Sequence, residues 1–220
     1  MASGFIFDID GTIIDSMPYH ERSWEVFLGR RGVPTAREDF FRRTAGRTGV
    51  EVMRELFGPL SDADAHALVR EKEAIYRELF APEFREIAGF TAFARAAKAA
   101  GVRIACATAG DPDNIAFAVA GLRLHDFFDA AVGAHDVARG KPEPDLFLLA
   151  AARIGVAPAQ CLVFEDAPLG IEGARRAGMR AVAIASSIPA DELGAPAHVV
   201  ARARDFTTLD PGELAGCLFA

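Results

Sequence analysis

Short apolar runs that alternate with helix-like segments constrain the fold of this 220-residue chain most strongly. The runs are rich in Val, Ile, Phe and Ala and show little polar alternation, as expected of strands with helices on both faces of their sheet. Alternating strands and helices favour right-handed crossovers, so the sequence predicts an α/β fold with a doubly wound parallel sheet. We predict five strands: Gly4–Ile9, Val102–Thr108, Ala130–Gly133, Cys161–Glu165 and Arg180–Ala185.

A glycine follows each helix-like segment of this alternating part. Glycine is common just past a helix because it adopts the left-handed conformation at little cost. The predicted helices are Phe90–Ala100, Asp113–Ala120, Glu143–Ile154 and Pro168–Ala177, and their stops are Gly101, Gly121, Gly155 and Gly178. Together the strands and helices predict a Rossmann-like core.

The segment between the first two predicted strands is too long for a simple connection. It spans 10–101, whereas a crossover with its helix needs only about 10–12 residues or more. Ser61 and Asp64 have the spacing of a capping box at a helix start. We therefore predict an α-helical cap domain at 16–84, inserted into a core made of 1–15 and 85–220. Its expected helices are Tyr19–Arg30, Arg37–Arg43, Val50–Phe57 and Asp62–Phe80.

Composition excludes several classes of protein. The net charge of −7 argues against broad nucleic-acid binding, although a local basic pocket could still bind an anion. The longest stretch without a charged residue, 154–164, is too short to span a membrane, and no basic segment suggests a signal peptide. Cys106, Cys161 and Cys217 are odd in number and far apart, and Cys106 and Cys161, in apolar strand-like runs, are predicted to be buried free thiols. We expect a cytoplasmic protein that binds neither membranes nor nucleic acid and is a monomer or a weak homodimer.

Acidic residues follow two of the predicted strands. Asp8 and Asp10 end the first strand, and Glu165 and Asp166 end the fourth. Ligands of an open parallel sheet bind beyond the carboxyl ends of its strands, so these acids are expected to face one site. Each group also has a structural interpretation: Asp8 and Asp10 could form a solvated turn, and Asp166 could cap the helix that begins at Pro168.

Two further segments belong to the same edge of the sheet. Thr108 offers a hydroxyl, and Ala109 and Gly110 offer backbone N–H groups after the second strand. Lys141 precedes Pro142, which suits the first turn of a helix. Carboxylates with one lysine suit Mg²⁺ and a phosphoryl group. No nucleotide-binding P-loop is present.

These four segments resemble the four motifs of the haloacid dehalogenase superfamily of phosphotransferases, in order and spacing over nearly the whole chain. The resemblance implies that Asp8 is the nucleophile that becomes an aspartyl phosphate. Asp10 would be the general acid and then the base, and we expect burial beside Asp8 to raise its pKa. Thr108 and Lys141 would hold the phosphoryl oxygens. Mg²⁺ would be bound by the Asp8 carboxylate, the Asp10 backbone carbonyl and Asp166, with Glu165 nearby or acting through water.

The insertion resembles the helical cap of the beta-phosphoglucomutase-like and small-phosphatase branch. His20, Arg47 and Lys72 match cap positions that reach the substrate in that branch, and Trp24 is expected in the cap core. Each of the three also has a bland interpretation as a solvated surface side chain. A mutase has a basic residue soon after the second motif, but this chain has Asp111 there.

The resulting prediction is a Mg²⁺-dependent phosphatase of a small phosphorylated metabolite, a sugar phosphate. A beta-phosphoglucomutase-type mutase and an inorganic pyrophosphatase are the enzyme alternatives. The aspartate at position 10 favours phosphoryl chemistry, because the dehalogenases proper lack it. A phospho-accepting signalling domain and a non-catalytic binding protein are the alternatives from other classes.

Overall fold

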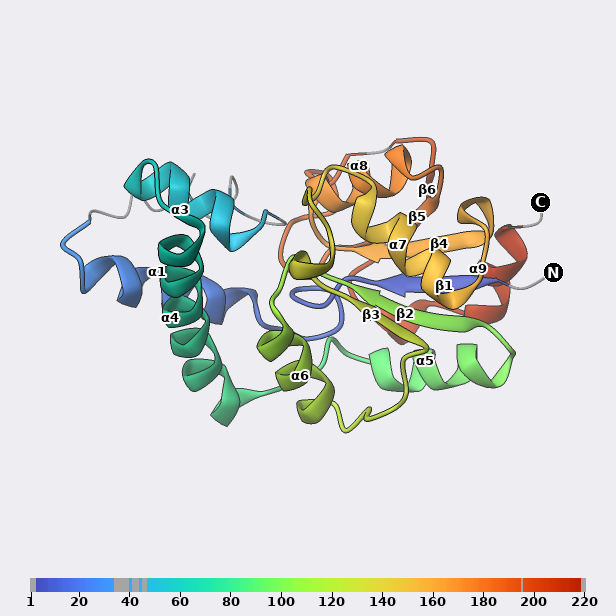
Figure 1. Ribbon diagram of the computed structural model, residues 1–220. Helices are drawn as coiled ribbons and strands as arrows, with labels where there is room; N and C mark the ends of the chain where they lie inside the picture. The colour runs from blue at the N-terminus through green and yellow to red at the C-terminus, as the bar shows by residue number, and fades with distance from the viewer. Residues whose placement is uncertain (1–2, 34–39, 41–43, 45–46, 195, 219–220) are drawn as a thin grey trace.

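The computed structural model describes residues 3–33, 40, 44, 47–194 and 196–218 (Figure 1). In these residues one sheet of six parallel strands has the order β3-β2-β1-β4-β5-β6. The fold class predicted from the sequence is confirmed. The strands are β1 (Gly4–Phe7), β2 (Arg103–Ala107), β3 (Ala130–Val132), β4 (Cys161–Glu165), β5 (Arg180–Ile184) and β6 (Val199–Ala203).

Helices connect the strands and also fill the long segment between β1 and β2. That segment contains α1 (Met17–Gly29), α3 (Gly49–Phe57) and α4 (Asp62–Phe80). The remaining helices are α5 (Phe90–Ala99), α6 (Pro112–Gly121), α7 (Asp145–Ile154), α8 (Pro168–Arg176) and α9 (Pro211–Cys217). The helix expected at 37–43 lies almost entirely outside the described residues. No described helix has both the length and the apolar composition to cross a membrane.

Alternate residues of the strands feed two apolar cores, one on each face of the sheet. Phe5 and Phe7 of β1 face α5 and α9, in a cluster of stacked and edge-on phenylalanine rings. Ile6 faces the opposite side, where α7 and α8 cover the sheet (Figure 1). Because side chains of a strand alternate between faces, this double burial explains the lack of polar residues in β1.

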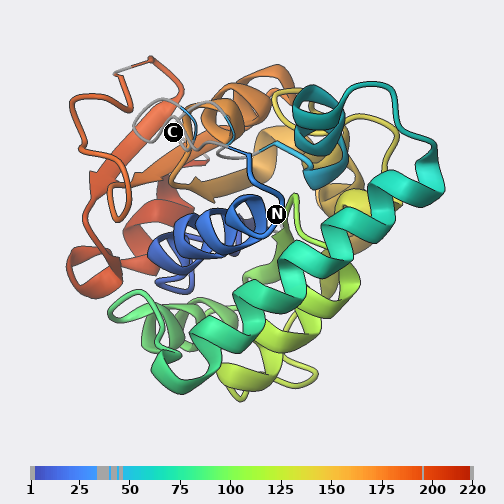
Figure 2. The ribbon, with the colours of Figure 1, turned by 90° about the vertical axis from the view of Figure 1, so that its left-hand side faces the viewer.

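The described helices of the insertion lie beyond the carboxyl ends of the strands (Figure 1), and α4 runs alongside α1 (Figure 2). They have a small apolar core of their own, which includes Trp24, Phe27 and Met53. Near the sheet, Tyr76 and Phe80 of α4 belong instead to the main core. The insertion is therefore anchored at its base, whereas its far end packs on itself. The exact limits of the cap, 16–84, stay a prediction.

Some local expectations are wrong. Gly121 is the last residue of α6 rather than its stop, and a Cβ there would lie 2.3 Å from the Phe84 ring, so packing requires the glycine. Helix α7 begins at Asp145 and not near Pro142, because Pro144 takes the capping position. Helix α8 is capped by Ala167 and not by Asp166.

One strand and one helix cap also differ from what the sequence predicts. Strand β6 was not predicted, since its residues are half-buried and include Arg202. Ser61 does cap α4 by accepting from the Asp64 backbone N–H, but its hydroxyl donates to the Asp64 carboxylate. The reciprocal capping box lies instead at α3, between Thr48 and Glu51.

Candidate active site

The neighbouring strands β1 and β4 bring an acidic cluster together at their carboxyl ends. Asp8 follows β1, Glu165 ends β4, and Asp166 comes next; one oxygen from each of these three carboxylates lies within 4.8 Å of the others. Lys141 Nζ donates to Asp8 Oδ1 at 2.5 Å and also to Glu165 Oε1. All four side chains are buried, so residues more than 150 positions apart share one desolvated site.

The loops around the cluster fix the position of Asp166. Its Oδ1 accepts from Thr12 Oγ1 at 3.2 Å, and its Oδ2 accepts from Ser187 Oγ at 2.5 Å. Gly11, with φ +76°, lets the chain pass close by, since a Cβ there would lie 2.1 Å from Asp166 Oδ2. Any other residue would be strained in this conformation and would also displace the carboxylate.

The electrostatics of the cluster suit a bound cation. Burial raises the pKa of Asp8 well above its usual value, although Lys141 acts in the opposite direction. Burial and then the charge of Glu165 raise the pKa of Asp166 to about 7. Burial alone would lower the pKa of Lys141, but Asp8 and Glu165 outweigh it and raise that pKa. The cluster thus holds more negative charge than Lys141 balances, and its hard oxygen donors fit Mg²⁺.

The loop after β2 faces the cluster with polar groups. Thr108 is buried, and its Oγ1 accepts the Gly110 backbone N–H at 3.0 Å. Because a hydroxyl that accepts one bond still has its own proton, Thr108 can donate to an anion. Ala109 and Gly110 line the same pocket.

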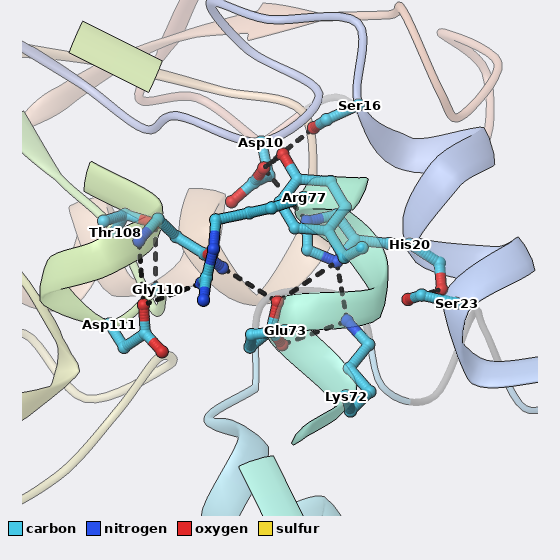
Figure 3. Close-up of polar contacts among 12 residues, drawn as sticks. Asp10, Ser16, His20, Ser23, Lys72, Glu73, Arg77, Thr108, Gly110 and Asp111 are labelled. Atoms are coloured by element: carbon cyan, nitrogen blue, oxygen red, sulfur yellow. Dashed lines mark hydrogen bonds and ion pairs between the residues drawn. The ribbon is translucent and has the colours of Figure 1, made fainter. Parts of the chain in front are cut away.

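The Asp10 carboxylate contacts side chains of the start of α1 and of α4 (Figure 3). Its Oδ1 accepts from Ser16 Oγ at 2.8 Å and from Tyr76 Oη at 3.1 Å. His20 Nε2 lies 3.0 Å from the same oxygen, without the alignment of a good hydrogen bond. Burial opposes ionisation, but His20 and the two hydroxyls outweigh it and lower the pKa of Asp10 to about 2. The expectation that proximity to Asp8 raises this pKa is therefore wrong.

His20 joins Asp10 to the cap lysine. Its ring stacks on Tyr76, with centroids 3.7 Å apart and planes at 12°, and Lys72 Nζ lies 2.7 Å from Nδ1. An ammonium group can only donate, so Nδ1 accepts and Nε2 holds the ring proton, facing Asp10. The buried Lys72 also lies 5.1 Å from the centre of the Trp24 ring.

A polar chain continues from Lys72 to the core helix α6 (Figure 3). Lys72 Nζ donates to Glu73 Oε1 at 3.0 Å, and Asn114 Nδ2 donates to Glu73 Oε2 at 2.8 Å. Arg77 donates to Asn114 Oδ1 at 2.6 Å and lies 3.8 Å from Asp111. These side-chain hydrogen bonds and ion pairs link α4 to α6.

One pocket is lined by all the predicted site residues: Asp8, Asp10, His20, Arg47, Lys72, Thr108, Ala109, Gly110, Lys141, Glu165 and Asp166. Arg47 also pairs with Glu55 at 2.6 Å. Glu73 and Asn114 also line the pocket, and neither is expected there from the sequence. Glu73 follows Lys72 directly, but its sequence pattern is that of an exposed charged stripe.

Known proteins match both the sequence and the fold. The haloacid dehalogenase-like hydrolase family matches residues 2–178. Fructose-1-phosphate phosphatase YqaB of Escherichia coli (strain K12) is 38% identical over 182 residues, which cover 82% of this chain and 95% of that protein. Beta-phosphoglucomutase of Bacillus subtilis (strain 168) is 32% identical over 192 residues, 84% of each chain.

A solved structure has the same architecture over its whole length. The crystal structure of a HAD hydrolase, family IA, variant 3, from Entamoeba histolytica has a TM-score of 0.88 to this chain at 28% identity. The match covers 99% of this chain and 100% of that one. The alignment therefore includes both the sheet and the helical insertion.

Proposed function

Because this chain belongs to the haloacid dehalogenase-like hydrolase family, we propose that it is a Mg²⁺-dependent phosphatase of a small sugar phosphate. The observation on which the proposal depends is the contact of Asp8 with Lys141 inside the buried cluster of Glu165 and Asp166. Such a site can place an anionic nucleophile against an anionic phosphoryl group, because positive charge offsets their repulsion.

Asp8 acts as the nucleophile in this proposal. Its carboxylate oxygen attacks phosphorus, the bond to the ester oxygen breaks, and an aspartyl phosphate forms. Lys141 opposes the rise in the Asp8 pKa that burial causes, and it neutralises the phosphoryl oxygens. Thr108 and the Ala109 N–H bind the remaining oxygens, while the Gly110 N–H holds the Thr108 hydroxyl in place. Asp8, Asp166 and the Asp10 backbone carbonyl would hold Mg²⁺, with Glu165 nearby, and the bound ion would supply further neutralisation of charge.

Asp10 transfers protons in both half-reactions. It gives a proton to the leaving oxygen and then takes one from the water that attacks the aspartyl phosphate. Its low pKa suits the second role directly. For the first role, the approaching phosphate dianion raises that pKa, since a nearby negative charge disfavours ionisation. His20, Ser16 and Tyr76 orient the carboxylate throughout.

Two features support hydrolysis over phosphoryl transfer to a second sugar phosphate. Asp111, where a mutase has a basic residue, caps α6 and lies near Arg77. Lys72 is already paired with Glu73. A mutase and a pyrophosphatase both need cations for a second phosphate.

We further propose that the enzyme works in the cytoplasm, where its buried cysteines stay reduced.

A phosphatase assay over a panel of sugar phosphates, with Mg²⁺ and with EDTA, tests this function. We expect phosphate release that requires Mg²⁺ and is lost, by at least about 10³-fold, in Asp8→Asn, because the amide cannot form the phosphoester. Near-normal turnover by that variant would exclude Asp8 as nucleophile. Interconversion of glucose phosphates without phosphate release would identify a mutase. A stable phosphoaspartate without turnover would identify a signalling domain.

A further inference from the structure

We propose that Glu73 determines the charge selectivity of the pocket, so that it accepts a phosphate monoester with an uncharged leaving group and rejects one with a second phosphate. This inference rests on the proposed function and narrows its substrate class. It assigns a specificity role to a residue that lies outside the four core motifs.

Contacts from both sides hold the Glu73 carboxylate in place. Lys72, its neighbour on α4, donates to Oε1, and Asn114 of the core helix α6 donates to Oε2. Arg77 in turn holds the Asn114 side chain through its amide oxygen. Glu73 is buried, with 12% of its side chain exposed, and lines the pocket that contains Asp8. It is therefore a fixed group at the cap side of the site.

Glu73 is ionised in this setting. Burial alone would raise its pKa, but Lys72, His20 and the Asn114 hydrogen bond outweigh it and lower that pKa. The negative charge of Glu73 offsets the positive charge of Lys72 at close range, where little solvent screens either group. The buried cap lysine is thus not available as an uncompensated partner for an incoming anion.

The rest of the described pocket lining gives no surplus of positive charge. Its acids are Asp8, Asp10, Glu21, Glu73, Glu165 and Asp166, and its basic residues are Arg47, Lys72 and Lys141. Lys141 is committed to the phosphoryl end through Asp8 and Glu165. Arg47 is paired with Glu55. A second phosphate near α4 would face Glu73 with no unpaired cation among the described lining residues.

The same group of side chains suits a polyhydroxy leaving group. Sugar hydroxyls can donate to the Glu73 carboxylate and accept from Lys72 and Asn114, which satisfies buried polar atoms on both sides. Replacement of Glu73 by Gln keeps the size and one of the two acceptor oxygens, so one of the two hydrogen bonds remains, and it removes the charge. Lys72 then becomes an uncompensated cation that can attract a phosphate.

Competitive inhibition with two ligands that differ only by a phosphate tests the inference. Fructose 1-phosphate and fructose 1,6-bisphosphate are compared as inhibitors of p-nitrophenyl phosphate hydrolysis in the presence of Mg²⁺. We expect the wild type to favour the monophosphate at least 10-fold by inhibition constant. Glu73→Gln should reduce the ratio of the two inhibition constants at least 10-fold. Glu73→Asp, which keeps the negative charge, should keep the preference for the monophosphate. Glu71→Gln, an exposed change on the same helix, should leave the ratio unchanged.

Two results would overturn the inference: an unchanged ratio in Glu73→Gln, or a wild-type preference for the bisphosphate. A general loss of stability would weaken the binding of both ligands equally and would leave the ratio of their inhibition constants unchanged. If no phosphate ester is hydrolysed, the proposed function fails, and calorimetric titration of the same two ligands still measures the selectivity. Failure of the function and failure of the inference are therefore separate outcomes.

Discussion

Asp8 and Asp10 are two residues apart, yet their surroundings shift their pKa values in opposite directions. Asp8 points into the acidic cluster, where burial dominates. Asp10 points to hydroxyl and imidazole donors that stabilise its charge. The sequence predicts that both carboxylates belong to the site, but not this contrast. Ser16 and His20 lie at the start of α1, but Tyr76 comes from α4, and no local pattern reveals where these side chains meet.

Asp166 offers a direct test of the metal site. We expect Asp166→Ala to raise the Mg²⁺ concentration for half-maximal activity at least about 10-fold, because losing a metal partner weakens affinity by roughly this factor or more. The KM for substrate at saturating Mg²⁺ should change much less. Activity is measured at a series of free Mg²⁺ concentrations.

Asp136→Ala is the matched control for this measurement. Asp136 is an acid paired with Arg153, outside the lining of the pocket that contains Asp8. It should keep the wild-type Mg²⁺ dependence. An identical Mg²⁺ curve for Asp166→Ala would rule out its metal role.

At the level of elements, the phenylalanine cluster ties α5 to the sheet. Phe93 of α5 is 4% exposed and lies 5.2–6.4 Å, ring centre to ring centre, from Phe5, Phe7, Phe164 and Phe206. We expect Phe93→Ala to lower the free energy of unfolding by about 3–5 kcal/mol, through lost burial and a residual cavity. Urea denaturation measures the change.

Leu148→Ala on α7 is the control for that substitution. Leu148 is 39% exposed, so its loss should cost less than about 0.5 kcal/mol. If Phe93→Ala unfolded at the wild-type urea concentration, the cluster would not stabilise the contact between α5 and the sheet.

The elements that were predicted well are those whose sequence reflects their burial. Strand β4 matches its predicted limits because both of its faces are covered. Strand β6 was missed because an edge strand is half-exposed and lacks a continuous apolar run. Gly121 was wrongly predicted as a helix stop, because the glycine is required by the close approach of Phe84, a residue 37 positions away, and not by the local backbone.

For the whole molecule, the raised pKa of Asp166 links stability to pH and metal. The pKa of about 7 in the folded protein lies above the usual aspartate value of 3.8. Between these values the folded state binds more protons than the unfolded state, so stability falls as pH rises from about 4 to 7. In EDTA we expect the Asp166 carboxyl group to lower the free energy of unfolding by roughly 2–4 kcal/mol between pH 4 and pH 7.

Chemical denaturation at several pH values, with EDTA and with Mg²⁺, measures this slope. Mg²⁺ should flatten it by binding the ionised carboxylates. Asp166→Asn should reduce the slope, because the amide does not titrate, while Asp8, whose pKa burial also raises, keeps its own contribution. A slope of equal size in the variant would assign the pH dependence to other groups.

The position of β1 between β2 and β4 affects how the enzyme loses activity when it unfolds. A strand hydrogen-bonded on both sides cannot fray without rupture of the sheet, so the backbone next to Asp8 should exchange its amide hydrogens only upon global opening. Edge strand β6 can open far more cheaply. Local unfolding at the edge of the sheet would thus leave Asp8 in place, and inactivation by heat should coincide with loss of the entire sheet rather than precede it.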